Sequence, residues 1–469
     1  MAVGTRWCTA VVGAAALSAA CQGAALAAEP PGLDATVDAA VSEVLAATGA
    51  PSASIAVVKD GAIAYVRAYG SARLETRLPA TPEMRYSIGS ISKQFTATAV
   101  LMLAEEGRLS LDDRVVRFLP GLTRARDVTV RHLLSMTSGY QDFWPQDYVM
   151  PMMLEPVSAA AILDRWATKP LDFEPGTKWQ YSNTNYVIAG LVVEKAGGVP
   201  LLEFLTQRVF APLRMTTVTD TDSAPLGPGD PERYLRFALG PPRPAPKEGS
   251  GWMYAAGELA MTARDLAAWD VSVIARSLMR PDTYRQMETE TVLADGVGTR
   301  YGLGVGVAAA DGHRLISHGG EVSGFTAQNN VYPDDRAAVA VLVNLDATNA
   351  SEQIASRVGK MLLEAPDAGS GTPVELARRV FEGLQRGRIE RSLLTANANA
   401  YFSDQALADC AASLAPLGAP KAFTQQARSS RGGMVFQRYR AAFAKRTLRI
   451  TTFTMPDGKL EQYMIAAEE

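Results

Sequence analysis

The chain has 469 residues, 47% of them hydrophobic and 20% charged, which is typical of a globular protein of two or three domains. Lys and Arg number 46 against 49 Asp and Glu, so the net charge is −3 and no overall basic field favours nucleic acid. Three His and three Cys are too few for Cys/His zinc modules or a disulfide framework. We therefore expect neither nucleic acid nor structural zinc.

The first 27 residues have the pattern of an export signal. Arg6 is the only charged residue before Glu29, and the Ala-rich apolar stretch after Arg6 ends at the small-x-small site Ala25-Leu26-Ala27. The apolar run is shorter than the about 20 residues that a membrane span requires. We therefore expect residues 1–27 to be cleaved and the mature protein to be periplasmic or secreted.

Helix and hairpin signals follow directly. Residues 33–47 predict a helix, and residues 52–58 and 62–68 predict two strands. Asp60-Gly61 between them supplies the positive φ angles of a tight turn. Residues 90–106 then predict a helix that is apolar on nearly every side and therefore buried.

A mostly helical middle and a Pro-rich loop near residues 222–250 precede further strand signals. These strands are predicted at residues 301–309, 313–318, 325–332 and 337–344, before a helix at about 350–364. This order predicts an α+β fold, in which strands from both ends of residues 28–368 form one antiparallel sheet around an inserted helical region.

Residues 365–373 resemble a linker, and residues 374–469 predict a small separate α+β domain of short helices followed by strands. That C-terminal part has 14 Lys and Arg against 9 Asp and Glu. It therefore carries a net charge of about +5 beside an acidic neighbour. Docking on that neighbour is the simpler interpretation, and contact with an anionic polymer of the cell envelope is the alternative. The oligomeric state is left open.

Three short motifs carry candidate chemistry. Ser90-Ile-Ser-Lys93 places a hydroxyl and an amine one helical turn apart, where a desolvated lysine can accept the serine proton. Tyr181-Ser-Asn183 offers a proton shuttle and a carbonyl-binding amide. His318-Gly-Gly320 follows an apolar strand, where glycines allow backbone N–H groups to approach a substrate.

Each motif alone also has a structural interpretation. Ser90 can cap a helix with a solvated Lys93, Tyr181 can be an ordinary buried tyrosine, and His318 can simply end a strand. The apolar sequence after Lys93 argues against a solvated lysine. The three motifs together are therefore more informative than any one of them.

In this order and at these separations, the motifs resemble the serine β-lactamase and penicillin-binding-protein superfamily. Further similarity to its class C-like branch of esterases and D-amino-acid peptidases lies in Val128–Gly139, Val209–Met215, Ala256–Asp265 and Tyr301-Gly-Leu-Gly304. The resemblance covers roughly residues 35–365. The C-terminal part resembles, more faintly, the small cone-shaped domains appended to other enzymes.

The resemblance implies that Ser90 is the acylated nucleophile, Lys93 its general base, and Tyr181 the group that protonates the leaving group and activates the deacylating water. Asn183 would bind the acyl group. His318 would replace the lysine of the third motif, with Gly320 beside it. The N–H groups of Ser90 and Glu321 would form the oxyanion hole. No metal or other cofactor is implied.

One departure from the family pattern bears on substrate. β-Lactamases and D-alanyl-D-alanine carboxypeptidases usually carry a lysine where this chain has His318, and that lysine steers the substrate's carboxylate. We therefore predict a hydrolase of esters or of small peptides and amides, including D-configured ones. The alternatives are a penicillin-binding carboxypeptidase or weak β-lactamase, and a non-catalytic peptidoglycan or peptide sensor. The role of Glu321 is also left open: its carboxylate either lies beside the oxyanion hole or points to solvent.

Overall fold

The computed structural model describes residues 33–146, 148–310, 312–363, 373–431, 434–455 and 458–468. The predicted export signal and most of the predicted linker lie outside these ranges. Within the described residues, no helix is both long and apolar enough to cross a membrane.

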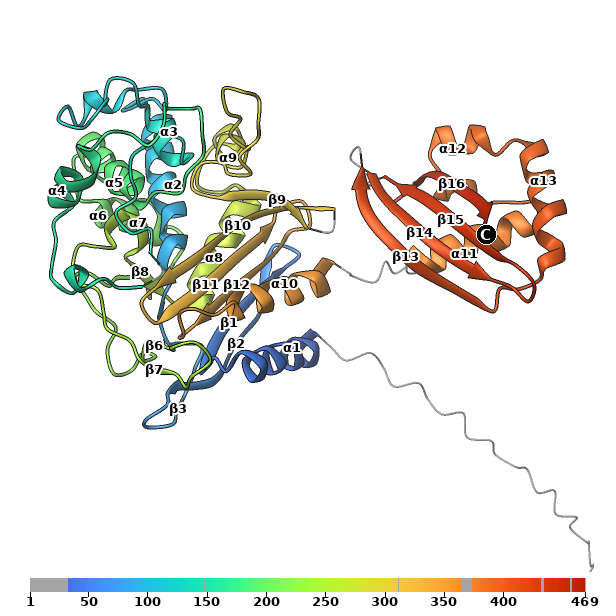
Figure 1. The fold of residues 1–469 in the computed structure, drawn as a ribbon, viewed down its shortest axis with the longest axis horizontal. Coiled ribbons are helices and arrows are strands. Elements are labelled where there is room, and N and C mark those ends of the chain that lie inside the picture. The colour runs from blue at the N-terminus through green and yellow to red at the C-terminus, as the bar shows by residue number, and fades with distance from the viewer. Residues whose placement is uncertain are drawn as a thin grey trace, which may run out of the picture.

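The predicted antiparallel sheet is present and contains strands from both ends of residues 28–368 (Figure 1). Its strands lie in the order β3-β2-β1-β12-β11-β10-β9. At its centre Ile55 of β1 lies opposite Val341 of β12. The strands are β1 (Ser52–Lys59), β2 (Ala62–Arg73), β3 (Leu78–Pro79), β9 (Gly306–Ala310), β10 (His313–Val322), β11 (Phe325–Tyr332) and β12 (Ala337–Val343).

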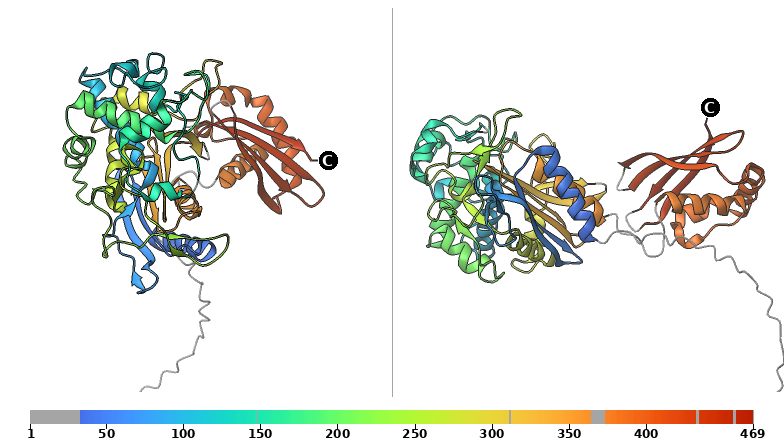
Figure 2. Two further views of the ribbon diagram at one scale, coloured as in Figure 1. Left: turned by 60° about the vertical axis from the view of Figure 1, so that its left-hand side comes forward. Right: turned by 90° about the horizontal axis from the view of Figure 1, so that it is seen from below.

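The two faces of this sheet are covered by different helices (Figure 2). Helices α1 (Leu33–Thr48) and α10 (Ala350–Leu363) pack on one face, and α8 (Ala263–Ala275) packs on the other. Successive side chains of a strand point to opposite faces. In β12 the valines Val339, Val341 and Val343 accordingly face α1 and α10, whereas Ala338, Ala340 and Leu342 belong to the core on the α8 side.

The helical region lies beyond the α8 face and surrounds α2 (Ser92–Glu105). Every residue of α2 from Ser92 to Leu103 is buried, and Phe95 packs its ring 4.8 Å from that of Trp269. The other helices of this region are α3 (Val130–Leu134), α4 (Ala159–Ile162), α5 (Asn183–Gly197), α6 (Leu201–Leu205), α7 (Tyr254–Gly257) and α9 (Pro281–Met287). Short strands β4 (Tyr86–Ser87), β5 (Thr219–Asp220), β6 (Tyr234–Leu235), β7 (Arg243–Pro244) and β8 (Leu259–Met261) connect them.

Several predicted boundaries differ from the structure. The strands expected to end at residues 68 and 318 continue to Arg73 and Val322, so His318-Gly-Gly320 lies within β10 rather than after a strand. The helix expected from Ser90 begins at Ser92, because Gly89 has φ +50° and Gly89–Ile91 form a 3₁₀ turn. The strand expected from residue 301 begins only at Gly306. Gly304, with φ +80°, instead turns the chain onto α2, where an added Cβ would lie 3.0 Å from the carbonyl oxygen of Lys93.

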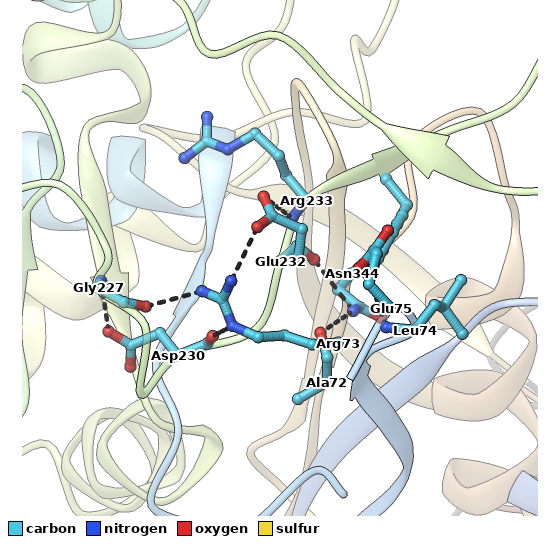
Figure 3. A network of polar contacts seen from close by, with 10 residues as sticks. Ala72, Arg73, Leu74, Glu75, Gly227, Asp230, Glu232, Arg233 and Asn344 are labelled. Atoms are coloured by element: carbon cyan, nitrogen blue, oxygen red, sulfur yellow. Dashed lines mark hydrogen bonds and ion pairs between the residues drawn. The ribbon is translucent and has the colours of Figure 1, made fainter. Parts of the chain in front are cut away.

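A network of polar contacts holds the Pro-rich loop against the end of β2 (Figure 3). The Arg73 guanidinium donates to Gly227 O at 3.0 Å, to Asp230 O at 3.2 Å and to the Glu232 carboxylate at 3.0 Å. The Asn344 amide donates to the carbonyl oxygens of both Ala72 and Glu232, at 3.1 Å each. The loop is therefore anchored where it continues into the rim of the candidate site.

The described C-terminal residues have a hydrophobic core of their own. Helices α11 (Pro373–Gln385), α12 (Ala396–Tyr401) and α13 (Asp404–Leu414) precede a four-stranded antiparallel sheet in the order β13-β14-β15-β16. Its strands are β13 (Ala422–Arg431), β14 (Met434–Ala442), β15 (Thr447–Thr454) and β16 (Leu460–Ala467). This order of short helices and then strands matches the expectation from sequence.

Candidate active site

Ser90 and Lys93 are brought together as their spacing predicts. Ser90 lies on the 3₁₀ turn and remains partly exposed, whereas Lys93 lies in the first turn of α2 and is fully buried. The Lys93 Nζ atom is 2.9 Å from Ser90 Oγ. The apolar surroundings of α2 thus keep the amine out of bulk water beside a hydroxyl that a substrate can reach.

The other two partners of Lys93 determine what its amine can do. Nζ lies 2.8 Å from Asn183 Oδ1 and 2.8 Å from the carbonyl oxygen of Ala256, and it donates to both. A neutral amine has two N–H bonds and one lone pair. Because Asn183 Oδ1 and Ala256 O are acceptors only, they take both hydrogens, and the lone pair is left facing Ser90.

Burial favours that neutral form. It lowers the pKa of Lys93 to about 7, against a smaller opposing effect of the Asp142 carboxylate. Asp142 itself is half-buried, and it accepts from the backbone N–H of Asn183 at 2.9 Å. Burial raises the pKa of Asp142 above its usual range. Asp142 therefore orients Asn183 and adjusts the charge of Lys93.

Asn183 is the first residue of α5, and Tyr181 lies two residues before it. The Lys93 Nζ atom lies 5.0 Å from the centre of the Tyr181 ring. The Tyr181 hydroxyl hydrogen-bonds Ser90, but burial outweighs this bond and raises the phenol's pKa. At neutral pH Tyr181 is therefore protonated and can pass a proton rather than hold a charge.

The third motif lies on β10, where successive side chains point to opposite faces of the sheet. His318 and Gly320 face the helical region and are buried, whereas Gly319 and Glu321 lie on the opposite, exposed side. An added Cβ at Gly320 would lie 1.9 Å from Ile88 O and 3.4 Å from Ser90 N, so only glycine allows this approach.

Backbone N–H groups of two segments meet beside the nucleophile. An added Cβ at Gly89 would lie 2.8 Å from Glu321 N, so the backbones of the 3₁₀ turn and β10 are in close contact. The N–H groups of Ser90 and Glu321 thereby border one space, as an oxyanion hole requires. The Glu321 side chain is exposed and accepts from Ala347 N at 3.0 Å, which favours the solvent-facing interpretation of this residue.

His318 is a neutral, hydrogen-bonded side chain. Its Nδ1 lies 2.6 Å from the carbonyl oxygen of Gly319 and must donate to it, which leaves Nε2 to accept from the Tyr301 hydroxyl at 3.0 Å. Burial, together with the nearby charge of Lys93, lowers the pKa of His318 to about 4. His318 therefore provides no cation where relatives with a lysine carry one.

Two residues of the site were missed from sequence. Asp142 lies in an irregular loop with no periodic pattern, three residues after the Val128–Gly139 segment. Tyr301 is part of the quoted Tyr301-Gly-Leu-Gly304 segment, but no role was assigned to it. The available signal for Tyr301 was its place in a segment similar to the family, whereas Asp142 had no local signal.

A pocket of about 1370 Å³ opens above Ser90. Among its described lining residues, Arg236 is the only Lys or Arg. Its aromatic lining includes Trp144, Tyr148 and Trp179, and its carboxyl groups are those of Asp142, Glu321, Asp346 and Glu352. The pocket thus combines apolar surface with an excess of negative charge.

The fold and the site together define a serine hydrolase, with a nucleophile, a desolvated amine and a pair of backbone donors around one pocket. Comparison with known families agrees: the β-lactamase family model matches residues 37–360. The chain belongs to the β-lactamase family.

Individual relatives indicate which branch of the family this chain resembles. The chain is 31% identical over 306 residues to a D-aminopeptidase of Brucella anthropi, an alignment that covers 63% of this chain and 56% of that protein. The chain thus spans little more than half the length of this relative. Similarity to class C-like peptidases, predicted from the motifs, is confirmed.

Solved structures show the same fold. A D-stereospecific amidohydrolase from Streptomyces sp. is similar with a TM-score of 0.60 and 27% identity, over 69% of this chain and 97% of that one. An octameric penicillin-binding protein homologue from Pyrococcus abyssi has a TM-score of 0.64 and 24% identity. It covers 93% of this chain and 96% of its own, so its similarity extends into the C-terminal part.

Proposed function

We propose that this chain is an exported amide hydrolase that cleaves small peptides or amides with an N-terminal D-residue through an acyl-enzyme on Ser90. The single observation that carries the catalytic part is the set of partners around Lys93 Nζ. Two acceptor-only oxygens at 2.8 Å direct its lone pair to Ser90 Oγ at 2.9 Å. The names of the D-aminopeptidase and D-stereospecific amidohydrolase relatives support the substrate class.

Acylation follows from this arrangement. Ser90 Oγ attacks the carbonyl carbon while its proton moves to Lys93, whose pKa near 7 leaves much of the amine free at neutral pH. The carbonyl oxygen becomes an oxyanion that accepts from the N–H groups of Ser90 and Glu321. The carbon–nitrogen bond then breaks, and the leaving amine takes the proton through Tyr181.

Deacylation reverses these roles. A water molecule loses a proton toward Tyr181 and Lys93 and attacks the ester carbonyl, and Ser90 Oγ leaves and regains a proton. Asp142 orients Asn183 by accepting from its backbone N–H and side-chain amide. The Asn183 side-chain amide is thereby placed to hydrogen-bond the acyl group.

The charges of the pocket favour an amine on the substrate. Its described lining has four carboxyl groups and one guanidinium, and His318 is neutral. A carboxylate-bearing substrate, such as a penicillin or a C-terminal D-alanyl peptide, would find little compensation there. An α-ammonium group and an apolar side chain fit the acidic and aromatic walls better.

Mass spectrometry and kinetics test the proposal together. Intact mass is measured for the wild type and Ser90→Ala after reaction with a fluorophosphonate and, separately, with a penicillin. Turnover is then compared for D-phenylalanine amide, L-phenylalanine amide and N-acetyl-D-phenylalanine amide. We expect a fluorophosphonate adduct on the wild type alone, and the highest kcat/KM for the D-amide with a free amine.

Other results would select the alternatives. A long-lived penicillin adduct without amide turnover would favour a penicillin-binding role. Absence of labelling by both reagents would favour a non-catalytic sensor. In His318→Lys, unchanged relative kcat/KM for penicillins and neutral amides would refute the explanation of the third motif.

A further inference from the structure

Three carboxylates gather beside the segment whose Ala256 carbonyl oxygen accepts from Lys93. Asp220 ends β5, Asp222 follows it, and Glu258 immediately precedes β8, which pairs with β5. One oxygen from each of the three lies within 4.8 Å of the others. Nothing in the catalytic steps uses this cluster.

Glu258 is the unusual member, because it is only 5% exposed. Among the described residues, no donor or cation pairs with its side chain. Its electrostatic neighbours are the carboxyl groups of Asp220, Asp222 and Glu194, all of which, like burial, raise its pKa. A buried carboxylate normally has a compensating partner. The equally buried Glu288, for comparison, binds both Arg276 and Arg314.

The nearest lysine does not supply that compensation. The Lys247 ammonium donates to the carbonyl oxygen of Thr221, and no salt bridge joins it to the three carboxylates. Asp220 accepts from Asp222 N and from Ser223 Oγ, at 2.7 Å each. Each carboxylate oxygen has two lone pairs, so these bonds leave coordination sites free.

We propose that Asp220, Asp222 and Glu258 form a site for a divalent cation of the size of Ca²⁺. Carboxylate oxygens are the ligands that Ca²⁺ prefers, at about 2.3–2.6 Å. Ligand oxygens around one such ion lie within about 5.2 Å of one another, and the three oxygens of this cluster, all within 4.8 Å of one another, meet that condition. Mg²⁺ demands a near-octahedral geometry and gives up its water ligands reluctantly, so a site of three protein carboxylates suits it less well.

The surroundings fit an ion that enters from solvent and stabilises the structure. Asp220 and Asp222 are partly exposed, whereas Glu258 lies behind them. The carbonyl oxygen of Glu258 accepts from Thr221 N at 2.8 Å, and the nearby Ala256 carbonyl oxygen accepts from Lys93. The ion would therefore fasten the Pro-rich loop to the segment that orients the catalytic amine.

Thermal unfolding of the full chain, freed of metal with a chelator, tests this site. We expect Tm to rise by about 1–3 °C with about 5 mM CaCl₂, if the dissociation constant is about 0.1–1 mM. MgCl₂ at the same concentration should have a smaller effect. Titration calorimetry with CaCl₂ gives the affinity independently of stability.

Matched variants distinguish binding from general stabilisation. Glu258→Gln and Asp222→Asn should each weaken Ca²⁺ binding at least tenfold, whereas Asp270→Asn, which alters a buried carboxyl elsewhere, should leave it unchanged. If Ca²⁺ neither shifts the wild-type Tm nor gives binding heat, the site is refuted. The same holds if Glu258→Gln retains the full Ca²⁺ response. A proton on Glu258 would then supply the compensation, and the proposed hydrolase would be unaffected.

Discussion

The two faces of the seven-stranded sheet differ in chemistry although they belong to the same strands. The face toward α1 and α10 is mainly aliphatic with a few tyrosines, and β11 adds the buried polar residues Thr326 and Asn330 to it. The face toward α8 includes, besides its aliphatic core, the fully buried polar residues Lys93, Asp270 and Asn329. On β10 the same alternation directs His318 and Gly320 to the α8 side.

This difference shows how one sheet separates stability from chemistry. Apolar packing on the α1 and α10 face needs no hydrogen-bond partners, so it holds the strands in register without specific polar geometry. The other face buries titratable groups, whose protonation depends on their neighbours. Substitutions on the first face should therefore change stability, and those on the second should change activity or the pH dependence of activity or stability.

The largest effect is expected at Gly320. In Gly320→Ala the new Cβ would lie 1.9 Å from Ile88 O, so the oxyanion-hole backbone must move and kcat/KM should fall at least about 100-fold. The matched control is Gly319→Ala on the exposed side, where the nearest atom is the side-chain oxygen of Gln328 at 3.2 Å. Equal losses in both variants would show that the close approach is not what matters.

On the opposite face, Val341→Ala should lower stability without altering catalysis. Val341 is fully buried against the α1 and α10 core, so deletion of two methyl groups should cost about 2–3 kcal/mol in the free energy of unfolding. Denaturant unfolding measures this loss, and kcat/KM under native conditions should stay within about threefold of the wild type. A larger change in kcat/KM would contradict the proposed division of roles between the two faces.

The pH dependence of kcat/KM should follow the protonation of Lys93. Because catalysis needs the free amine and the pKa of Lys93 is about 7, kcat/KM should rise with pH and level off above that value. In Asp142→Asn the carboxylate that favours the ammonium form is lost, so the midpoint should move to lower pH by up to about one unit. A midpoint that stays in place or moves upward would contradict the role of Asp142.

A further effect, on stability rather than on catalysis, is expected at Asp270, which accepts from the Asn329 amide at 2.8 Å. Burial raises the pKa of Asp270 to about 8, so the folded protein retains a proton that the unfolded chain releases above about pH 4. Wild-type stability should therefore decline from about pH 4 to 8 on account of this group. Asp270→Asn should gain stability relative to wild type between pH 5 and pH 8, as measured by denaturant unfolding at both values. A constant difference would show that Asp270 is ionised in the folded state.

Much of the architecture was predictable because its signals are local. The Asp60-Gly61 turn has φ angles of 55° and 79°, as the hairpin pattern indicated. The alternating and continuous apolar runs located β1, β11, β12 and the helices at both ends. The boundaries that failed near the site, at Ser90 and at residues 301 and 318, lie where the chain is shaped by contacts within the site. Tertiary contacts there outweigh local propensity.

By itself the sequence determined the order of elements and the pairing of Ser90 with Lys93, since a helical turn brings residues three apart together regardless of what surrounds them. Only the tertiary structure decided the protonation states. Burial, the Asp142 carboxylate and the Tyr301 hydroxyl come from distant segments, and they leave Lys93 able to act as a base and His318 neutral. Local spacing places groups next to each other, but the pKa of a buried group depends on every element packed around it.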